Sequence, residues 1–309
     1  MAADIRFDGR VAIVTGAGIG LGRSHALGLA ARGAKVVVND LGVSRDGTGS
    51  TSEASEVVVE EIKAMGGEAI AHGADVSDEA GVKDMVAQAM DAWGRIDICV
   101  NNAGILMDKT FAKMDMSTFR KVVDVHLIGS ANVAHACWPI MREQQYGRIV
   151  FTSSSSGLYG NFGQANYGAA KAAMMGLMNV LHLEGARDNI RVNTLAPTAV
   201  TRMTQELFPA EAAEMLAPET ITPGLLYLVS EDAPSHVIMG AGGGSFAQTR
   251  VYETQGITLT GDENTPEAVA AQFDQLTDAS GQTEMPDAFS QTKKYALNAA
   301  QARGLTLDW

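Results

Sequence analysis

The stretch VAIVTGAGIGLGRSHA, residues 11–26, decides the fold of this chain. A short apolar, β-branched run leads into the spacing TGxxxGxG, formed by Gly16, Gly20 and Gly22, and then into a helical pattern. Such a turn lets a pyrophosphate approach the backbone, and the helix N-terminus offers it free N–H groups and a favourable dipole. A purely structural glycine turn is the alternative. The strand-to-helix setting favours a dinucleotide site in which Gly16, Gly20 and Leu21 lie against the cofactor.

The rest of the chain repeats this alternation of short apolar runs and amphipathic patterns. Strands are expected at 11–16, 35–40, 67–76, 95–104, 147–154, 190–197 and near 236–240. Helices are expected at 20–33, 52–65, 78–93, 116–145 and 163–186. The alternation predicts an α/β fold, a single Rossmann-type doubly wound parallel sheet with helices on both faces.

The pattern changes after about residue 245. A strand is expected near 248–252, and Thr265 and Pro266 have the residue types of an N-cap and first helical position. The stretch 278–291 is polar and turn-rich. Because 246–309 is too short and polar to form a good core alone, we predict one NAD-binding domain over 1–245 with a C-terminal extension, 246–309, packed on it.

Charge and composition exclude several classes of partner. The 309 residues carry a formal net charge of −13, which argues against nucleic acid or an anionic membrane surface. The sequence shows no signal peptide, no apolar run of membrane-spanning length and no peroxisomal address at its end, LTLDW, so a cytoplasmic protein is expected. Cys99 and Cys137 lie in apolar stretches and are expected to be buried thiols, and no Cys/His cluster indicates a metal.

An acidic residue at the end of the second strand indicates which dinucleotide is bound. Asp40 follows the glycine loop by about twenty residues, where a carboxylate accepts hydrogen bonds from the adenosine ribose and repels a 2′-phosphate. This favours NAD over NADP. A turn role for Asp40, or a phosphate contact by nearby Arg45, is the alternative. Further candidate cofactor contacts follow the third and fourth strands: Asp75, Val76, Asn102, Ala103 and Gly104.

The stretch SSSSGLYGNFGQANYGAAK, residues 153–171, contains the candidate chemistry. Tyr167 and Lys171 are four residues apart on a predicted helix and share a face. A nearby ammonium, together with the positive charge of oxidised nicotinamide, would lower the pKa of the phenol from its usual value near 10. Tyr167 could then take a proton from an alcohol while hydride leaves for NAD⁺. An ordinary buried tyrosine and a solvated lysine are the alternative, which the glycine loop and the serine-tipped strand disfavour.

These motifs, with N101NAG104 and N193xxxPT198, resemble the short-chain dehydrogenase/reductase family over about residues 8–244. The resemblance implies that Ser154, thirteen residues before the tyrosine, hydrogen-bonds the substrate oxygen and that Lys171 binds the nicotinamide ribose. Ser153 would face the sheet packing, while Ser155 and Ser156 would lie in a loop. The remaining implied cofactor contacts follow the sixth strand: Pro197, Thr198 and Thr201.

One residue departs from the family pattern inside the candidate site. His126 stands where the family usually has an asparagine, whose backbone carbonyl holds a water at a local break in a helix. That water continues a proton path from the tyrosine. His126 is therefore expected to support this path, with direct acid/base work and ordinary packing as alternatives. Thr198 is a second departure, because the family has glycine after the proline.

Longer strings narrow the resemblance to the (3R)-hydroxyacyl-CoA dehydrogenase units of peroxisomal multifunctional enzymes type 2. They are 36–42, 95–114, 126–130, 146–171, 201–209, 250–259 and 265–278. The resemblance implies a free-standing, NAD-dependent dehydrogenase that oxidises a (3R)-hydroxyacyl-CoA to the 3-oxoacyl-CoA. A 17β-hydroxysteroid dehydrogenase, an NADPH-dependent 3-oxoacyl-carrier-protein reductase and a non-catalytic nucleotide-binding protein are the alternatives.

Two regions bear on substrate and assembly. Segment 202–217 is amphipathic and rich in methionine, which suits either a lid over an acyl chain or a packing helix. The expected helices 116–145 and 163–186 carry many small and apolar residues, and in the family they pair across a two-fold axis. A homodimer or homotetramer is therefore expected.

Overall fold

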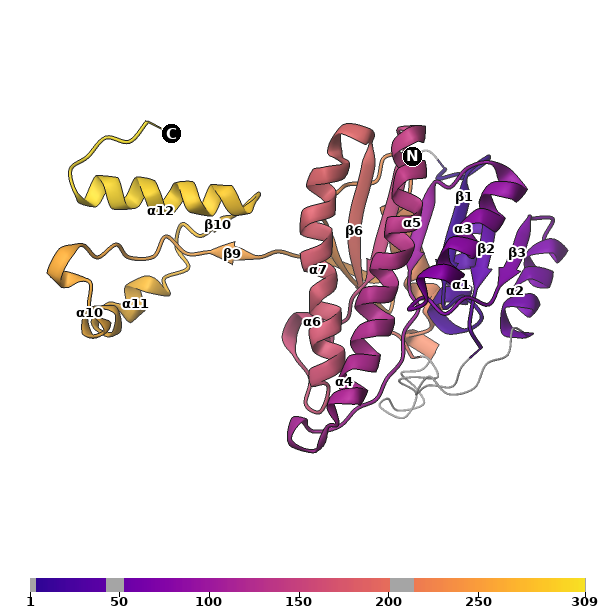
Figure 1. Cartoon of the computed structure of the whole chain (residues 1–309), viewed down its shortest axis with the longest axis horizontal. Helices are drawn as coiled ribbons and strands as arrows, with labels where there is room; N and C mark the ends of the chain where they lie inside the picture. Colours follow the sequence, from indigo (N-terminus) through magenta and orange to yellow (C-terminus); the bar gives the residue numbers. More distant parts are fainter. Residues whose placement is uncertain (1–3, 43–52, 201–213, 309) are drawn as a thin grey trace. The chain divides into compact units, whose positions relative to one another are not determined.

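The structure, a computed structural model, describes residues 4–42, 53–200 and 214–308. The chain divides into two compact units, Met1–Gln248 and Thr249–Trp309 (Figure 1). Thr201, most of the segment 202–217, and Arg45 lie outside the described residues.

The first unit is built on one eight-stranded sheet with the order β3-β2-β1-β4-β5-β6-β7-β8. The strands are β1 (Val11–Thr15), β2 (Lys35–Asn39), β3 (Ala69–His72), β4 (Ile98–Asn101), β5 (Gly147–Thr152), β6 (Ile190–Pro197), β7 (Ile238–Gly242) and β8 (Ser245–Thr249). Neighbours from β3 to β7 pair in parallel. The chain order reverses between β1 and β4, which places a ligand crevice at their carboxyl ends. The predicted fold class is confirmed.

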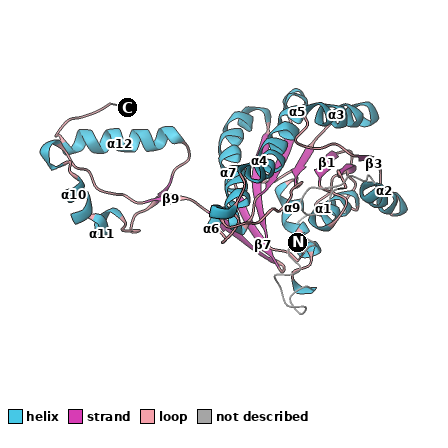
Figure 2. Ribbon diagram, turned by 60° about the horizontal axis from the view of Figure 1, so that its bottom comes forward, coloured by secondary structure: helices cyan, strands magenta, loops and turns pink. Residues whose placement is uncertain are grey.

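Helices cover both faces of the sheet (Figure 2). One face carries α1 (Gly20–Ala30), α2 (Glu53–Ala64) and α9 (Thr222–Leu228); the other carries α3 (Glu79–Trp93), α4 (Met116–Val123), α5 (Gly129–Gln144) and α7 (Ala165–Gly185). Alternate residues of β1 enter different cores, since Val14 belongs to the same core as Leu29 of α1 and Ile13 to the same core as Cys137 of α5. A strand buried on both faces must be apolar almost throughout, which explains the continuous runs in the sequence.

Several expected boundaries were wrong, and three of the differences bear on the site. The helix expected at 116–145 is interrupted by a π-helical turn, η2 (Asp124–Ile128). Ser155 and Ser156 begin a short helix, α6 (Ser155–Tyr159), instead of a loop, because Ser154 is its N-cap and accepts from the Ser156 N–H at 3.2 Å. The third strand ends at His72, before the expected residue 76, and beyond it the Ala74 N–H donates to the His72 side-chain Nδ1 at 3.0 Å.

The second unit consists of short elements. They are β9 (Tyr252–Glu253), β10 (Thr283–Glu284), α10 (Pro266–Ala271), α11 (Phe273–Leu276) and α12 (Ala288–Ala302). Thr265 caps α10 as predicted, by accepting from the Ala268 N–H at 3.2 Å. Helix α12 was not predicted, although Asp287, which accepts from the Ser290 N–H at 2.7 Å, is an N-cap signal that the sequence shows. None of the described residues of this unit is buried, as its polar sequence suggested.

Short 3₁₀ turns complete the described elements. They are η1 (Phe111–Lys113), η3 (Ala186–Asp188), η5 (Pro218–Thr220) and η6 (Gly261–Glu263).

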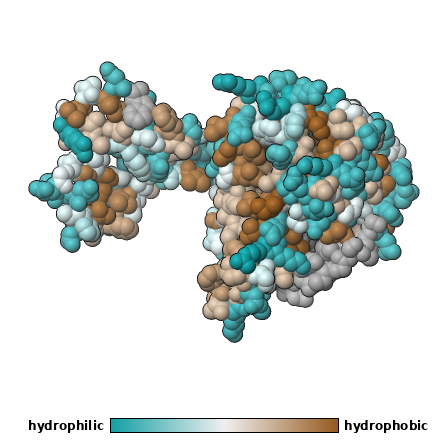
Figure 3. Space-filling view, in the orientation of Figure 1, coloured by the Kyte–Doolittle hydropathy of each residue, from teal (hydrophilic) through white to brown (hydrophobic). Residues whose placement is uncertain are grey.

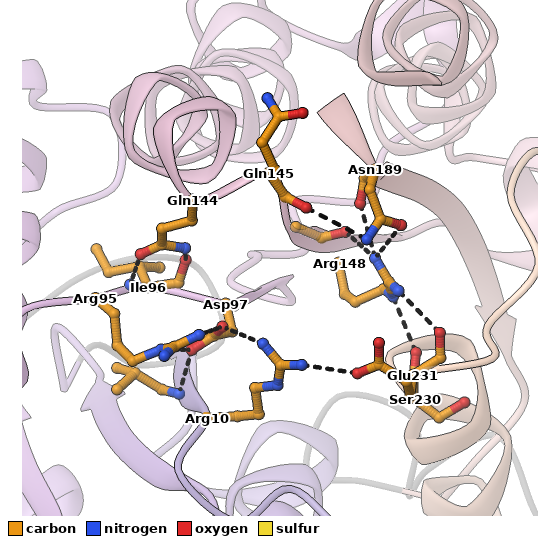
Figure 4. A network of polar contacts seen from close by, with 12 residues as sticks. Arg10, Arg95, Ile96, Asp97, Gln144, Gln145, Arg148, Asn189, Ser230 and Glu231 are labelled. Atoms are coloured by element: carbon orange, nitrogen blue, oxygen red, sulfur yellow. Dashed lines mark hydrogen bonds and ion pairs between the residues drawn. The ribbon is translucent and has the colours of Figure 1, made fainter. Parts of the chain in front are cut away.

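A polar network ties together the amino ends of the strands, away from the expected crevice (Figure 4). The fully buried Asp97 carboxylate accepts from Arg10 Nη1 at 2.9 Å, and Arg10 also pairs with Glu231 at 2.7 Å. The equally buried Arg148 donates to the Glu231 carbonyl at 2.9 Å. The Cζ atoms of Arg10 and Arg148 lie 3.6 and 4.1 Å from the centre of the Tyr146 ring. These bonds hold the amino ends of the strands to the segment after α9.

Membrane-spanning helices, metal ligands and cysteines were also considered in the sequence. Within residues 4–42, 53–200 and 214–308 no helix is long and apolar enough to cross a membrane. The same residues hold no group of three or more potential metal ligands from His, Cys, Asp and Glu. Cys99 and Cys137 are free and buried, as predicted.

Candidate active site

The glycine loop lies where the chain order of the sheet reverses. Gly16 and Gly20 have φ values of +62° and +57°, which favour glycine. A Cβ on Gly22 would lie 2.1 Å from the Gly16 carbonyl oxygen, and one on Gly16 would lie 2.8 Å from the Ala103 Cα. The loop is therefore closed to side chains at these positions, and the half-buried Leu21 follows it on the first turn of α1. This geometry fits a loop whose backbone meets a pyrophosphate.

Asn102 holds the glycine loop against the end of β4. Its side-chain Nδ2 donates to the carbonyl oxygens of Thr15 and Gly16, both at 3.0 Å. The Thr15 hydroxyl in turn accepts from the backbone N–H groups of Asn102 at 3.0 Å and Ala103 at 3.1 Å. The sequence indicated Asn102 as a candidate cofactor contact, and this role of its side chain in holding the glycine loop was not predicted.

The Asp40 side chain stabilises the turns around it, which was the alternative to a ribose contact. Its Oδ2 accepts from the Gly18 N–H and its Oδ1 from the Gly42 N–H, each at 2.7 Å. The carboxylate thus lies beside the glycine loop at the end of β2, where each oxygen still has a lone pair for another donor. Both roles are compatible with this geometry.

Asp75 and Val76 lie in the loop after β3, a few residues beyond the strand end at which they were expected. The Asp75 carboxylate accepts from the Ser77 N–H at 2.9 Å and hydroxyl at 2.7 Å. The side chain of Val76 is buried, and its carbonyl oxygen accepts from Asn132 at 3.0 Å. Both residues are therefore held in a fixed turn at the carboxyl edge of the sheet.

The tyrosine, the lysine and one of the four serines meet where β5 ends against α7. The Ser154 side chain lies near enough to the Tyr167 phenol to act on its pKa. The buried Lys171 Nζ donates to the Thr152 carbonyl at 2.6 Å and lies 5.7 Å from the centre of the Tyr167 ring. Ser153 is turned away, because its hydroxyl donates to the Lys171 carbonyl at 2.8 Å. The structure therefore brings Ser154, Tyr167 and Lys171 together.

The ionisation of this group differs from the expectation. Burial raises the pKa of Tyr167, the hydrogen bond from Ser154 opposes that rise, and the Asp108 charge adds to it. Burial also lowers the pKa of Lys171 to about 7, so its ammonium is only partly populated at neutral pH. The sequence predicted that Lys171 lowers the pKa of Tyr167, but the larger effect is the rise that burial causes. A phenolate at neutral pH needs positive charge beyond that of Lys171.

His126 lies in the π-helical turn, edge-on to Tyr167, with 5.2 Å between ring centres. Its Nε2 is 2.8 Å from the carbonyl oxygen and 3.1 Å from the amide nitrogen of Ile105. A Cβ on Gly104 would come within 2.2 Å of the ring. Burial, with the Lys171 charge as a smaller cause, holds the pKa of His126 well below its ordinary value, so the ring is neutral at physiological pH. These contacts suit a structural role between the turn and the chain after β4.

We expect His126→Asn to retain most activity, because an amide can still bond the Ile105 backbone. His126→Leu leaves buried polar groups without a partner and should lower kcat by about tenfold. Steady-state kinetics across pH, with the melting temperature as a fold control, test this. Loss of turnover in His126→Asn, together with loss of an ionisation from the pH profile, would show that the imidazole itself transfers protons.

Sequence reasoning missed a polar residue at the start of α7. Gln164 is buried, and its Nε2 donates to Asp108 Oδ2 at 2.8 Å. Its Oε1 accepts from the Ser156 hydroxyl at 2.7 Å and from Asn161 Nδ2 at 3.1 Å. The only signal was a polar residue three positions before the tyrosine.

The end of β6 borders a pocket. Pro197 ends the strand, and the Thr198 N–H donates to the Ala241 carbonyl at 2.7 Å. A pocket of about 250 Å³ lies between α6 and the strands β6 to β8. It is lined by Ser155, Leu158, Tyr159, Ala196, Thr198, Gly240, Ala241, Gly242, Ser245, Phe246 and Ala247. An apolar group thus has a place close to Ser154.

Known proteins resemble this chain along most of its length. A short chain dehydrogenase family model matches residues 10–212. A protein of Mycobacterium tuberculosis named as a short-chain type dehydrogenase/reductase is 46% identical over 273 residues, 88% of this chain and 95% of the relative. Mouse peroxisomal multifunctional enzyme type 2 is 46% identical over 283 residues, 91% of this chain but only 38% of the mouse protein.

Solved structures agree with these matches. The full-length peroxisomal multifunctional enzyme type 2 of Drosophila melanogaster has a TM-score of 0.80 and 35% identity, over 96% of this chain and 50% of the other. A 7α-hydroxysteroid dehydrogenase complexed with NADH and 7-oxo glycochenodeoxycholic acid has a TM-score of 0.70 and 31% identity. The match covers 78% of this chain and 95% of the other. A chain that matches the family model and its relatives to this extent belongs to the short-chain dehydrogenases, oxidoreductases that act on CH–OH groups.

Proposed function

We propose that this chain oxidises a (3R)-hydroxyacyl-CoA to the 3-oxoacyl-CoA with NAD⁺, using Tyr167 as the base. The meeting of Ser154, Tyr167 and Lys171 at the carboxyl edge of the sheet carries the proposal. The narrower substrate class is supported by the match to mouse peroxisomal multifunctional enzyme type 2, which extends over 91% of the chain. The pocket beside α6 offers space for an apolar tail.

The residues present fit a dinucleotide. The glycine loop is closed to side chains and leads into a helix N-terminus, which together suit a pyrophosphate. NAD⁺, when bound, supplies the hydride acceptor. Ser154 would then donate to the substrate oxygen, Tyr167 would take the hydroxyl proton as the carbon loses hydride, and Lys171 would hold the nicotinamide ribose. The positive nicotinamide is the further charge that a phenolate at Tyr167 needs.

Asp40 is proposed to favour NAD⁺ over NADP⁺. Asp40→Ser should weaken NAD⁺ binding and narrow the gap to NADP⁺, because a carboxylate that repels a 2′-phosphate is removed. Asp40→Asn is the matched variant, since its amide oxygen can keep one of the two backbone N–H bonds while the charge is lost. Dissociation constants of both cofactors, measured by titration, give the ratio. An unchanged ratio in both variants would show that Asp40 has only its turn role.

A substrate panel tests the reaction. The purified protein is given (3R)-hydroxyacyl-CoAs of increasing chain length with NAD⁺ or NADP⁺, and the nicotinamide absorbance is followed. The (3S) enantiomers are the matched controls. Stereospecific turnover with NAD⁺ is expected, and its absence overturns the proposal. Faster turnover of steroid alcohols would favour the second candidate, a hydroxysteroid dehydrogenase, which the similar structure with a bound steroid supports.

The chain is further proposed to act as a homodimer or homotetramer in the cytoplasm. Apolar side chains gather on the exposed side of α7, where Val180 and Leu183 are about half exposed (Figure 3). Apolar groups placed together on a helix face suit burial against a second copy. Light scattering on the purified protein measures the mass, and a monomer would contradict the assembly. Cell fractionation tests the location.

A further inference from the structure

A chain of hydrogen bonds leads from the segment after β4 to Ser154. Gln164 Nε2 donates to Asp108 Oδ2 at 2.8 Å, and the Ser156 hydroxyl donates to Gln164 Oε1 at 2.7 Å. The backbone N–H of Ser156 then donates to Ser154 Oγ at 3.2 Å. The residues come from three segments that are separated in the sequence but meet beside Tyr167.

The Asp108 carboxylate determines which way the Gln164 amide points. An ionised carboxylate only accepts hydrogen bonds, so the amide must turn its NH₂ group towards Asp108. Its oxygen then faces Ser156 and the Asn161 amide, which also donates to it at 3.1 Å. Because Gln164 is buried, turning the amide round would leave these donors without an acceptor.

The same arrangement fixes the direction in which Ser154 can donate. Its oxygen accepts from the Ser156 N–H, so its own proton stays available for a partner on the Tyr167 side. Backbone bonds hold the surrounding frame, since the Lys109 N–H donates to the Gly163 carbonyl at 2.9 Å. Asn166 Nδ2 donates to the Met107 carbonyl at 3.0 Å. The segment after β4 and the start of α7 are thereby joined on either side of Gln164.

We propose that Asp108 and Gln164 are positioning residues: Asp108 orients the Gln164 amide, and Gln164, through Ser156, holds Ser154 in the orientation that donates to the substrate oxygen. The proposal rests on the catalytic roles given above to Ser154 and Tyr167. Neither Asp108 nor Gln164 needs to touch the substrate. Their effect is on kcat, since the hydrogen bond from Ser154 strengthens as negative charge develops on the reacting oxygen.

An exchange of the two polar groups tests this proposal. Gln164→Glu places a second carboxylate against Asp108, so the contact becomes repulsive, and kcat should fall by about tenfold or more. Adding Asp108→Asn restores a donor and an acceptor at this contact with their positions reversed. The amide at 108 now donates, and the carboxylate at 164 accepts. The double variant should recover kcat to within about threefold of the original protein, which is a coupling that independent sites do not show.

Controls separate positioning from a general effect of charge or folding. Gln88→Glu, on the exposed side of α3, adds the same charge far from the site and should leave kcat unchanged. NADH titration and melting temperature report whether each variant is folded and binds cofactor. A Gln164→Glu protein with unchanged kcat, or a double variant no better than the single one, overturns the proposal.

The pH profile gives a second readout that a purely structural contact would not move. The charged and titratable groups around Tyr167 are Lys171 on α7, His126 on the π-helical turn and Asp108 after β4. The Asp108 charge contributes to the raised pKa of Tyr167, so Asp108→Asn should move the rise of kcat/KM with pH to lower pH. An unmoved profile in a folded Asp108→Asn protein counts against the link to Tyr167. These assays can use any alcohol that the wild type oxidises, so failure of the acyl-CoA assignment is a separate result.

Discussion

Replacing Tyr167 with phenylalanine should lower kcat by about 10²–10⁴-fold, because the substitution removes only the oxygen that takes the proton. The aromatic ring remains, with its edge-on contact to His126 at 5.2 Å, so the fold and the cofactor site should survive. Steady-state oxidation of the best alcohol from the panel measures the loss. NADH titration should give a dissociation constant within about threefold of that of the original protein.

The pH dependence of kcat/KM tests the same role of Tyr167. Oxidation needs the deprotonated phenol, and burial raises the pKa of Tyr167 in the free enzyme. kcat/KM should therefore increase with pH into the alkaline range in the original protein, and the residual rate of Tyr167→Phe should lack that increase. Substantial activity in a folded Tyr167→Phe protein, with the increase intact, would mean that another group is the base.

Ser154→Ala should cost about 10²–10³-fold in kcat, as expected when a donor to the reacting oxygen is removed. The neighbouring serines are matched controls with different expected results. Ser155→Ala should change kcat little, since Ser155 is exposed at the start of α6 and the bonds that join Gln164 to Ser154 come from Ser156. Ser153→Ala loses the bond to the Lys171 carbonyl, so it should lower the melting temperature more than kcat.

The series of serine variants also tests the alignment of the tyrosine with its serine. Ser156→Ala should lie between Ser154→Ala and Ser155→Ala in kcat, because Ser156 joins Gln164 to Ser154. kcat, KM and melting temperature measured for all four alanine variants complete the test. If Ser155→Ala loses the most activity, the catalytic serine has been placed one residue too early.

The sequence alone determined the features that depend on local pattern and spacing. Continuous apolar runs indicated a sheet buried on both faces, and the glycine spacing at 16–22 indicated a tight loop at the first strand-to-helix junction. The four-residue interval between Tyr167 and Lys171 placed both on one side of a helix. These signals lie within one or two turns of chain, so no distant contact was needed to interpret them.

The tertiary structure alone decided which distant groups meet and what burial does to them. Gln164 and Asp108 are 56 positions apart, and no periodicity or motif in the sequence joins them. Asn102 closes on Gly16 in the same way, across 86 positions. The raised pKa of Tyr167 and the lowered pKa of Lys171 arise mainly from burial, which depends on every element packed around the site. Spacing along the chain fixes which face a residue occupies, whereas its charge state and its partners depend on the whole fold.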